Sequence, residues 1–280
     1  MNTRTDLAIE SFPDNFSDSV HIQKRDGIFS ITEIILDDDS YIDSLGKGHG
    51  RYVTLEGQNL MNFSDDYEDM IHELADEIRK FIPDGDILVV GLGNRDITPD
   101  ALGVMVSSKV LATRHLRNEL GNNMDGFLKS LRRVSTFAGG VLGQTGIESA
   151  EIVSAVCNEI KPAGIIAVDA LACSDVNRMG TTIQISDSGI SPGSGVANAR
   201  KELSEKIMGV PVTAIGVPTV IDTHTIIRNF TNSKPDNFPN MMVTSREIDR
   251  LIERSAQLIA YGINLALQPS LTVSDVRGLF

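Results

Sequence analysis

Residues 86–103 have the sequence Asp86-Ile-Leu-Val-Val-Gly-Leu-Gly-Asn-Arg-Asp-Ile-Thr-Pro-Asp-Ala-Leu-Gly103, and this stretch decides the fold class. The apolar run Ile87–Val90 has the length and composition of a strand that is buried on both faces. Glycines then break the run, and Thr98, Pro99 and Asp100 suit the N-cap, the first position and the first turn of a helix. The stretch therefore predicts a strand, a turn and a carboxylate at the positive end of a helix, where open α/β sheets usually place their chemistry.

The rest of the chain extends this strand–helix pattern on both sides. Before residue 86 we expect a hairpin at His21–Leu36 around Asp26-Gly27, a strand at Arg51–Glu56 and a helix at Ser64–Phe81 capped by Ser64. After it we expect strands at Val134–Ala138, Ile165–Val168, Thr181–Ser186 and Val212–Val217, and helices at Asp100–Arg117, Gly146–Ile160 and Ser245–Gln268. The pattern predicts a three-layer α/β fold, with a mostly parallel twisted sheet flanked by helices and an N-terminal β-hairpin segment.

Composition narrows the possible classes of function. The chain has 280 residues, 41% hydrophobic and 22% charged, which is typical of an ordinary soluble globular protein. A net charge of -13 argues against direct binding of nucleic acid, which needs clustered Lys and Arg. With two cysteines, no long apolar span and no signal peptide, we expect a cytoplasmic protein without disulfides and without a membrane anchor.

A second acid, Asp169, repeats the position of Asp100, because it directly follows the apolar strand Ile165–Val168. Strands of one parallel sheet end at the same edge, so the two carboxyls can meet there. A close pair cannot both ionise easily near neutrality, and a pair that shares a proton can activate a water and protonate a leaving group. The alternative interpretation is that each acid only caps the turn after its strand. Strand-end position alone leaves both interpretations open.

A third acid, Asp187, lies in the small-residue loop after the expected strand Thr181–Ser186. The glycines of this loop, Gly189, Gly193 and Gly195, let backbone N–H groups approach a ligand. The loop lacks the Gly-Lys-Ser/Thr of a Walker phosphate-binding loop. It is therefore a candidate for substrate contact, with Asp187 as a secondary catalytic candidate.

The first loop, at Gly91-Leu-Gly93-Asn94, matches only half of the dinucleotide-binding fingerprint. Asp96 stands where the third glycine should be, and its charge would repel a pyrophosphate. We expect no nucleotide and no other cofactor, and keep Gly93 and Asn94 as candidates for substrate contact.

Taken together, several segments resemble the germination proteases of endospore-forming bacteria. The resemblance runs in one order from residue 4 to the C-terminal helix, which makes it more specific than any single motif. The segments that carry it are Arg4–Glu10, Gly50–Glu56, Val90–Asn94, Thr98–Gly103, Thr113–His115, Gly143–Glu148, Ala167–Ala172, Thr182–Ile190, Pro192–Gly195 and Gly216–Val220.

The resemblance implies an endopeptidase of the spore core that degrades small acid-soluble spore proteins during germination. It also implies a homotetramer, and it puts the catalytic pair proposed for the family on Asp100 and Asp169. The implied fold is phosphorylase-like and resembles that of the hydrogenase maturation proteases. Those proteases use equivalent acids to hold a metal. A metal-dependent peptidase with Asp100 and Asp169 as ligands therefore stays as an alternative, and so does a non-catalytic regulatory homologue.

The resemblance also gives the N-terminal arm a role. Members of this family are made as zymogens that remove their own N-terminal segment, and their substrates are cut after an acid in a Thr-Glu-hydrophobic-Ala-like motif. Thr5-Asp6-Leu7-Ala8 resembles that motif, so we expect self-cleavage between Asp6 and Leu7. The cut would divide the chain into a leader, residues 1–6, and a single α/β protease domain, residues 7–280. This leader and the connection at Ile221–Thr244 are both shorter than the family pattern, which bears on zymogen control and substrate range.

Overall fold

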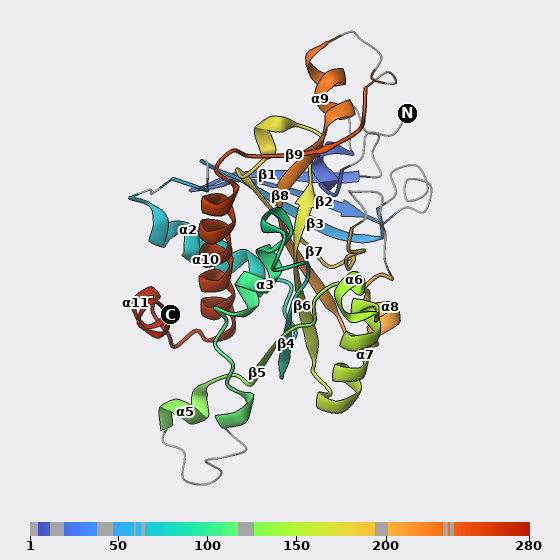
Figure 1. Ribbon diagram of the computed structural model, residues 1–280. Coiled ribbons are helices and arrows are strands. Elements are labelled where there is room, and N and C mark those ends of the chain that lie inside the picture. The colour runs from blue at the N-terminus through green and yellow to red at the C-terminus, as the bar shows by residue number, and fades with distance from the viewer. Residues whose placement is uncertain are drawn as a thin grey trace.

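A mixed sheet of nine strands runs through the centre of the molecule, with helices on both of its faces (Figure 1). This arrangement, seen in a computed structural model, confirms the predicted α/β class. The structure describes residues 5–11, 20–37, 47–58, 60–62, 65–116, 126–193, 201–231, 235 and 238–280. Ser64 and Gly195, which the sequence analysis singled out, lie outside the described residues.

Helices separate most of the strands along the chain. The strands are β1 (Val20–Asp26), β2 (Ser30–Leu36), β3 (Gly50–Glu56), β4 (Ile87–Gly91), β5 (Val134–Ala138), β6 (Gly164–Ala172), β7 (Thr182–Ser186), β8 (Val212–Asp222) and β9 (Met242–Thr244). The helices are α2 (Tyr67–Arg79), α3 (Leu102–Ser107), α5 (Gly126–Ser130), α6 (Leu142–Thr145), α7 (Ser149–Ile160), α8 (Glu205–Met208), α9 (Thr223–Phe230), α10 (Ile248–Leu267) and α11 (Val273–Leu279). Short 3-10 turns are η1 (Ala8–Glu10), η2 (Thr98–Asp100) and η4 (Val176–Arg178).

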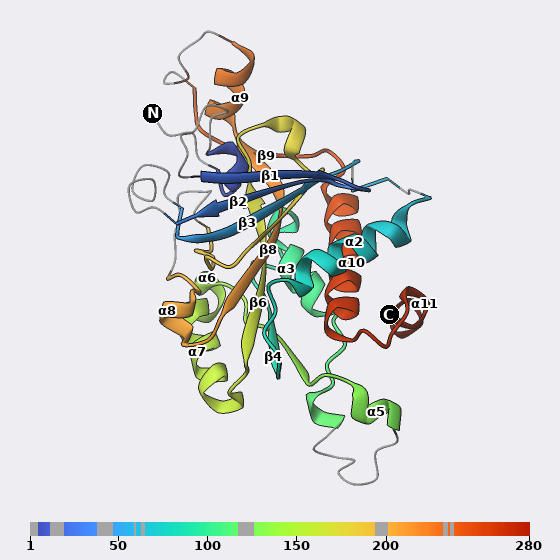
Figure 2. The same cartoon turned by 180° about the vertical axis from the view of Figure 1, so that it is seen from behind.

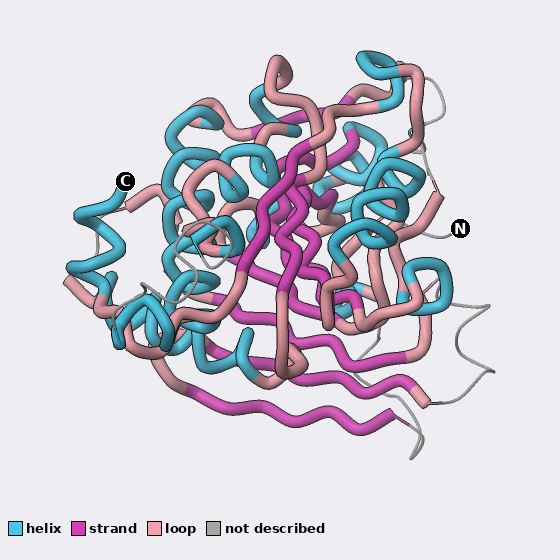
Figure 3. The backbone as a smooth tube through the Cα atoms, turned by 90° about the horizontal axis from the view of Figure 1, so that it is seen from below, coloured by secondary structure: helices cyan, strands magenta, loops and turns pink. Residues whose placement is uncertain are grey.

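Parallel pairing is confined to one half of the sheet. The strand order is β1-β2-β3-β7-β8-β6-β4-β5, with β9 on β8. The pairs β5–β4, β4–β6 and β6–β8 are parallel, as the strand–helix alternation predicted, and the other pairs are antiparallel. The N-terminal hairpin joins this sheet through β3 and β7, and the strands turn markedly from one edge to the other (Figure 3).

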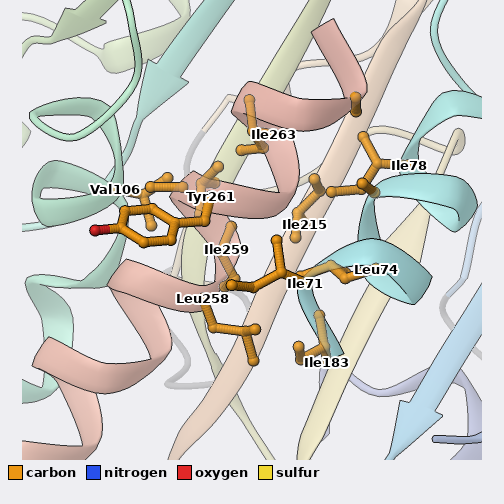
Figure 4. Close-up of a cluster of buried hydrophobic side chains, with 14 of the residues drawn as sticks. Ile71, Leu74, Ile78, Val106, Ile183, Ile215, Leu258, Ile259, Tyr261 and Ile263 are labelled. Carbon is orange, nitrogen blue, oxygen red and sulfur yellow. The ribbon is translucent and has the colours of Figure 1, made fainter. Parts of the chain in front are cut away.

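The buried strands carry apolar side chains on both faces, which explains the helix layers. Ile87 and Val89 of β4 belong to the cluster beneath α2, α3 and α10, whereas Leu88 and Val90 belong to the cluster beneath α7 and α8. Figure 2 shows the two helix layers from behind. In the larger cluster, Ile71, Leu74 and Ile78 of α2 meet Leu258, Ile259 and Ile263 of α10 over the sheet (Figure 4).

The expected long helix at Asp100–Arg117 is wrong. Thr98–Asp100 forms the 3-10 turn η2, without a side-chain cap from Thr98, and α3 begins at Leu102 and ends at Ser107. Two serine hydroxyls at this end bond to backbone carbonyls, Ser107 Oγ to Val104 O at 2.8 Å and Ser108 Oγ to Met105 O at 2.7 Å. Such bonds compete with helix continuation.

Other predicted bounds shift by a few residues. The hairpin pairs Asp26 with Ser30, so its loop has three residues, Gly27–Phe29, and not two. The helix expected at Gly146–Ile160 begins later, at Ser149, as α7. The separate helix α6 precedes it and ends at its C-cap Gly146, which adopts φ 72°. The helices expected at Ser64 and Ser245 begin at Tyr67 and Ile248.

Two strands extend further than their apolar cores suggested. β6 continues through Asp169 to Ala172, so Asp169 lies inside the strand and not after its end. β8 continues to Asp222, and the short connection at 221–244 contains α9 and β9, which folds back on β8 (Figure 1). None of the helices in the described part of the chain is long and apolar enough to cross a membrane.

Candidate active site

Three neighbouring strands place Asp169, Gly216 and Gln184 in one row across the sheet. Asp169 of β6 is paired with Gly216 of β8, and Gly216 is paired with Gln184 of β7. Directly paired residues project on the same face of a sheet. Each of these three residues has neighbours on its own strand that point the other way. Those neighbours include Val168, Ile183 and Ile215, which belong to the cluster under α10. Asp169 and Gln184 therefore project on the opposite face, with a glycine between them.

The carboxyl of Asp169 is buried, with 4% of the residue exposed. Burial raises the pKa of Asp169 well above its ordinary value, and the negative charges of Asp100 and Asp6 raise it further. The backbone N–H of Ala170, which donates to Asp169 Oδ1 at 2.9 Å, lowers the pKa and only partly offsets these causes. Asp169 is thus a carboxyl that holds its proton to higher pH than an exposed aspartate.

Asp100 lies close enough to Asp169 for its charge to act on that carboxyl. Burial raises the pKa of Asp100 as well, against the lowering effect of the Asn94 N–H, which donates to Asp100 Oδ2 at 2.9 Å. The charge of Asp100 is thus one of the causes that raise the pKa of Asp169. Burial is the largest cause for both acids, so each binds its proton more tightly than an exposed aspartate does.

Glycines and one buried threonine hold the η2 turn against the strand ends. Gly93 has φ 100°, and a Cβ on it would lie 1.9 Å from the carbonyl oxygen of Asp100. A Cβ on Gly103 would lie 2.1 Å from Val168 O, the residue before Asp169. Thr219 Oγ1 donates to Pro99 O at 2.8 Å. These close contacts fix Asp100 over the end of β4 beside β6.

The N-terminal arm, residues 5–11, lies along the end of β6. Asp6 N donates to Ala172 O at 2.9 Å, and Ala172 N donates to Asp6 Oδ2 at 2.8 Å. Leu7 is fully buried in a cluster with Leu171 and Ile221. The arm is therefore bound by backbone pairing on one side of the Asp6–Leu7 bond and by an apolar contact on the other.

Farther along the arm, the carboxylate of Glu10 is bound by a set of donors. It accepts hydrogen bonds from Ser174 N at 2.6 Å, Ser174 Oγ at 2.9 Å and Asp175 N at 2.9 Å, and it lies 3.6 Å from Arg178 Nη1. Its side chain is 2% exposed. A fourth hydrogen bond comes from Thr5 Oγ1 of the arm itself, so four hydrogen bonds and a cation compensate the burial of this charge.

A cavity of about 210 Å³ lies beside the Asp6–Leu7 bond. Asp6, Asp169, Gln184 and Gly216 line it, as do the loop glycines Gly189 and Gly193 that the sequence indicated. Leu7, Gly93, Asn94 and Asp100 are not among its lining residues.

Asp187 does not line this cavity. It is exposed, and its Oδ1 accepts a hydrogen bond from Arg51 N at 2.7 Å, next to Gly50 of β3. That contact gives Asp187 a place at the start of β3 and away from the Asp169 carboxyl.

The cavity residues that the sequence analysis did not single out include Gln184 and Lys47. Lys47 Nζ donates to Thr5 O at 3.1 Å, and burial lowers its pKa while the charges of Asp6 and Glu10 raise it. Gln184 had a usable signal, because it is the only amide in the apolar strand β7 and is 8% exposed. A buried amide needs hydrogen-bond partners, which marks such a position for scrutiny. Lys47 had no such signal in the sequence, since it precedes β3 in a polar stretch.

Among the described residues, no three His, Cys, Asp or Glu side chains gather into a group that could hold a metal ion. Asp100 and Asp169 thus offer two carboxyls, one of them with a strong tendency to stay protonated, and a metal would have to displace that proton.

A family model described as "Germination protease" matches residues 10–232 of the chain. The germination protease of Clostridium tetani is 37% identical, over 99% of both chains, and that of Caldanaerobacter subterraneus subsp. tengcongensis is 38% identical, over 100% of this chain and 98% of its own. The germination protease of Bacillus subtilis is 37% identical over 79% of each chain. The chain therefore belongs to the germination protease family.

The alignment with the Clostridium tetani protein runs over 322 positions, whereas this chain has 280 residues. The relative therefore has residues without a counterpart in this chain. Among solved structures, the [NiFe] hydrogenase maturation protease HycI of Thermococcus kodakarensis is similar with a TM-score of 0.37 and 20% identity, covering 67% of this chain and 98% of its own.

Proposed function

We propose that this member of the germination protease family is an endopeptidase that cleaves small acid-soluble spore proteins during germination. We further propose that it is made as a zymogen, which cuts its own Asp6–Leu7 bond. The observation that carries the proposal is the position of that bond, beside a cavity lined by Asp6 and Asp169, where the charge of Asp6 also acts on the Asp169 carboxyl. The arm thus serves as an internal example of a bound substrate.

The contacts of the arm suggest what a substrate needs. An extended segment would pair with the end of β6 as Asp6 does, with its acid accepting the Ala172 N–H. The next residue would fill the apolar site that Leu7 occupies among Leu171 and Ile221. An acid followed by an apolar residue therefore fits both sides of the scissile bond.

The proposed mechanism uses the two acids as a singly protonated pair. Asp100 acts as the base and takes a proton from a water that attacks the carbonyl carbon of the residue before the cut. Asp169, which keeps its proton, stabilises the developing negative charge on the carbonyl oxygen. The C–N bond then breaks, the nitrogen takes a proton from the pair, and the products are a carboxyl and an amine. The pKa values that activity reports belong to the pair as a unit.

Exchange of either acid for its amide tests this mechanism. We expect Asp100→Asn and Asp169→Asn each to lower self-cleavage and substrate cleavage by about 100-fold or more, because general acid–base catalysis contributes about 10² to 10⁴ in rate. Each variant is incubated with a purified small acid-soluble spore protein, and the fragments are identified by mass spectrometry. Asp249→Asn, an exposed change on α10, serves as the matched control.

Two results would contradict the proposal. Full activity of either single variant would rule out the two-acid mechanism, and a wild-type product whose N-terminus is not Leu7 would rule out the proposed self-cleavage site. A parallel assay with a chelator addresses the metal-dependent alternative, which predicts loss of activity and recovery on addition of a divalent metal.

The assembly and location that the resemblance implies belong to the same proposal. We propose a homotetramer in the cytoplasm of the spore core, without direct binding of nucleic acid or membrane. Residues 7–280 would then form the mature protease domain after loss of the leader, residues 1–6. Light scattering on the chain before and after conversion tests the tetramer, and a monomeric mass in both states would contradict it.

A further inference from the structure

We propose that Gln184 is a catalytic residue of this peptidase, whose side-chain N–H stabilises the oxyanion that forms on the scissile carbonyl. This inference rests on the proposed self-cleavage at Asp6–Leu7, which identifies the scissile bond. It adds a third functional group to the two acids, on a strand that neither acid belongs to.

The side-chain amide of Gln184 forms hydrogen bonds on both sides of the scissile bond. Its Nε2 donates to the carbonyl oxygen of Asp6 at 3.1 Å, and its Oε1 accepts from the backbone N–H of Ala8 at 2.6 Å. The second bond fixes the orientation of the amide, because only the oxygen can accept from an N–H. The amide nitrogen is thus directed at the oxygen on which negative charge develops when water attacks.

The sheet holds Gln184 rigidly in this position. It is the third residue of β7, between Ile183 and Ile185, which are fully buried on the other face. Gly216 stands between Gln184 and Asp169 in the row of paired residues, and its lack of a side chain leaves room for the arm. A Cβ on Gly216 would lie 2.6 Å from Leu171 Cγ and 2.8 Å from Asp169 O, so the strands allow no larger residue there.

A purely structural role for Gln184 makes a different prediction. In the described part of the chain, both hydrogen bonds of the side-chain amide go to the arm. If Gln184 only fastened the arm, its loss would free the arm and leave hydrolysis of an added peptide unchanged. If it is catalytic, the amide is available to a substrate that replaces the arm, and its loss lowers the rate of bond cleavage.

The step is balanced without any further reactant. Water adds to the carbonyl carbon, the water proton passes to the carboxyl pair, and the carbonyl π electrons move to the oxygen that faces Gln184 Nε2. When the tetrahedral species collapses, the electron pair returns, the C–N bond breaks and the nitrogen takes a proton from the pair. Gln184 donates a hydrogen bond throughout and exchanges no proton.

The test compares Gln184→Glu and Gln184→Met with the wild type on a peptide that contains Thr-Asp-Leu-Ala-Ile-Glu. Gln184→Glu keeps an acceptor for the N–H of the residue after Leu but loses the donor. We expect its kcat at neutral pH to fall about 10²- to 10³-fold, as for other oxyanion donors, with a much smaller change in KM. Gln184→Met loses both bonds at nearly constant volume, so we expect the same fall in kcat together with a higher KM. The control Gln257→Glu makes the same chemical change on α10, outside this cavity, and should leave both constants unchanged.

A pH profile separates catalysis from a folding defect. The introduced carboxyl of Gln184→Glu would lie in a cavity lined by Asp6, Asp169, Glu202 and Lys47. When it is protonated, its O–H can donate to the scissile carbonyl again, so kcat relative to wild type should recover as the pH is lowered. A misfolded variant shows no such recovery.

Wild-type kcat in Gln184→Glu at neutral pH would overturn the inference while leaving the proposed function intact. A fall in kcat that is the same at every pH would overturn it as well, because the donor would then not be the cause. If the wild type itself does not cut the peptide between Asp and Leu, the proposed function fails and not the role of Gln184 alone.

Discussion

At the scale of single residues, the buried carboxyl of Asp169 links catalysis to stability. An aspartate in an unfolded chain has a pKa of about 3.9, and burial raises the pKa of Asp169 well above that value. Between the two pKa values the folded protein binds a proton that the unfolded chain lacks. The free energy of unfolding therefore falls as pH rises through this window, by about 1.4 kcal/mol for each pH unit.

Asp169→Asn removes this dependence, because an amide does not ionise. We expect the variant to be inactive and more stable than wild type at neutral pH, with a difference in unfolding free energy that grows as pH rises above about 4. Urea unfolding at a series of pH values measures the difference. The exposed Asp37→Asn is the control for the loss of a carboxyl outside the site. If the free energy of unfolding varied with pH in the same way for Asp169→Asn and wild type, a raised pKa of Asp169 in the native state would be contradicted.

At the residue scale, the sequence carried a local signal for the two acids. Asp100 and Asp169 each follow an apolar strand core, and both lie at the same edge of the sheet. Gln184 and Lys47, by contrast, are recognised only by their contacts with the arm in the folded chain. Gln184 is 178 residues from Asp6 along the sequence. No spacing within one sequence encodes such a contact.

At the scale of elements, the packing of α3 on the strand ends positions Asp100. A Cβ on Gly103 would lie 2.1 Å from Val168 O and 2.6 Å from Leu92 N, both backbone atoms that cannot move aside. We expect Gly103→Ala to destabilise the protein by about 1 to 3 kcal/mol, as overpacking does, and to lower activity because η2 shifts with α3. Gly143→Ala is the matched control, since nothing lies within 4 Å of a Cβ there and alanine favours a helix. Urea unfolding and peptide hydrolysis measure both effects, and a Gly103→Ala variant with wild-type values would refute the close packing.

Element types were largely predictable, and element ends were not. The apolar periods of β4, α2 and α10 are strong because each buries a face against a large cluster. The helix after Asp100 ends early for tertiary reasons, since the N–H of Leu111 donates to Asn264 Oδ1 on α10 instead of continuing the helix. β6 extends past Asp169 because the long strand β8 is there to pair with it, as far as Val220.

At the scale of the whole molecule, the site depends on contacts between distant parts of the chain. β3 pairs with β7 about 130 residues later, and the arm pairs with Ala172. The sequence predicted a hairpin and an arm, but only the folded chain brings the arm across β6 to the cavity. This long-range arrangement is why the sequence alone left paired catalysis and simple turn capping equally open.

The same arrangement predicts how the zymogen is converted. The Asp6–Leu7 bond lies at the cavity of its own chain, and Glu10 fastens the arm to Ser174, Asp175 and Arg178 of that chain. Conversion should therefore be intramolecular, with a half-time that does not change when the protein is diluted. Mass spectrometry of samples taken over time at several protein concentrations measures this half-time. An active chain added to the Asp169→Asn variant should leave the variant uncut on the same time scale, and a rate that rises in proportion to concentration would show cleavage between molecules instead.

Glu10 supplies a second check on conversion within one chain. Glu10→Gln keeps the shape of the side chain but removes the charge that four hydrogen-bond donors and Arg178 bind. Hydrogen bonds to a charged group contribute about 1.5 to 3 kcal/mol, so we expect the arm to dissociate more often and conversion to slow by about 10-fold or more. Glu253→Gln, an exposed change on α10, should convert at the wild-type rate. The rate of an intramolecular reaction depends on the fraction of chains with a bound arm. An unchanged conversion rate in Glu10→Gln would therefore mean that the arm is cut from a position other than the one it occupies in this structure.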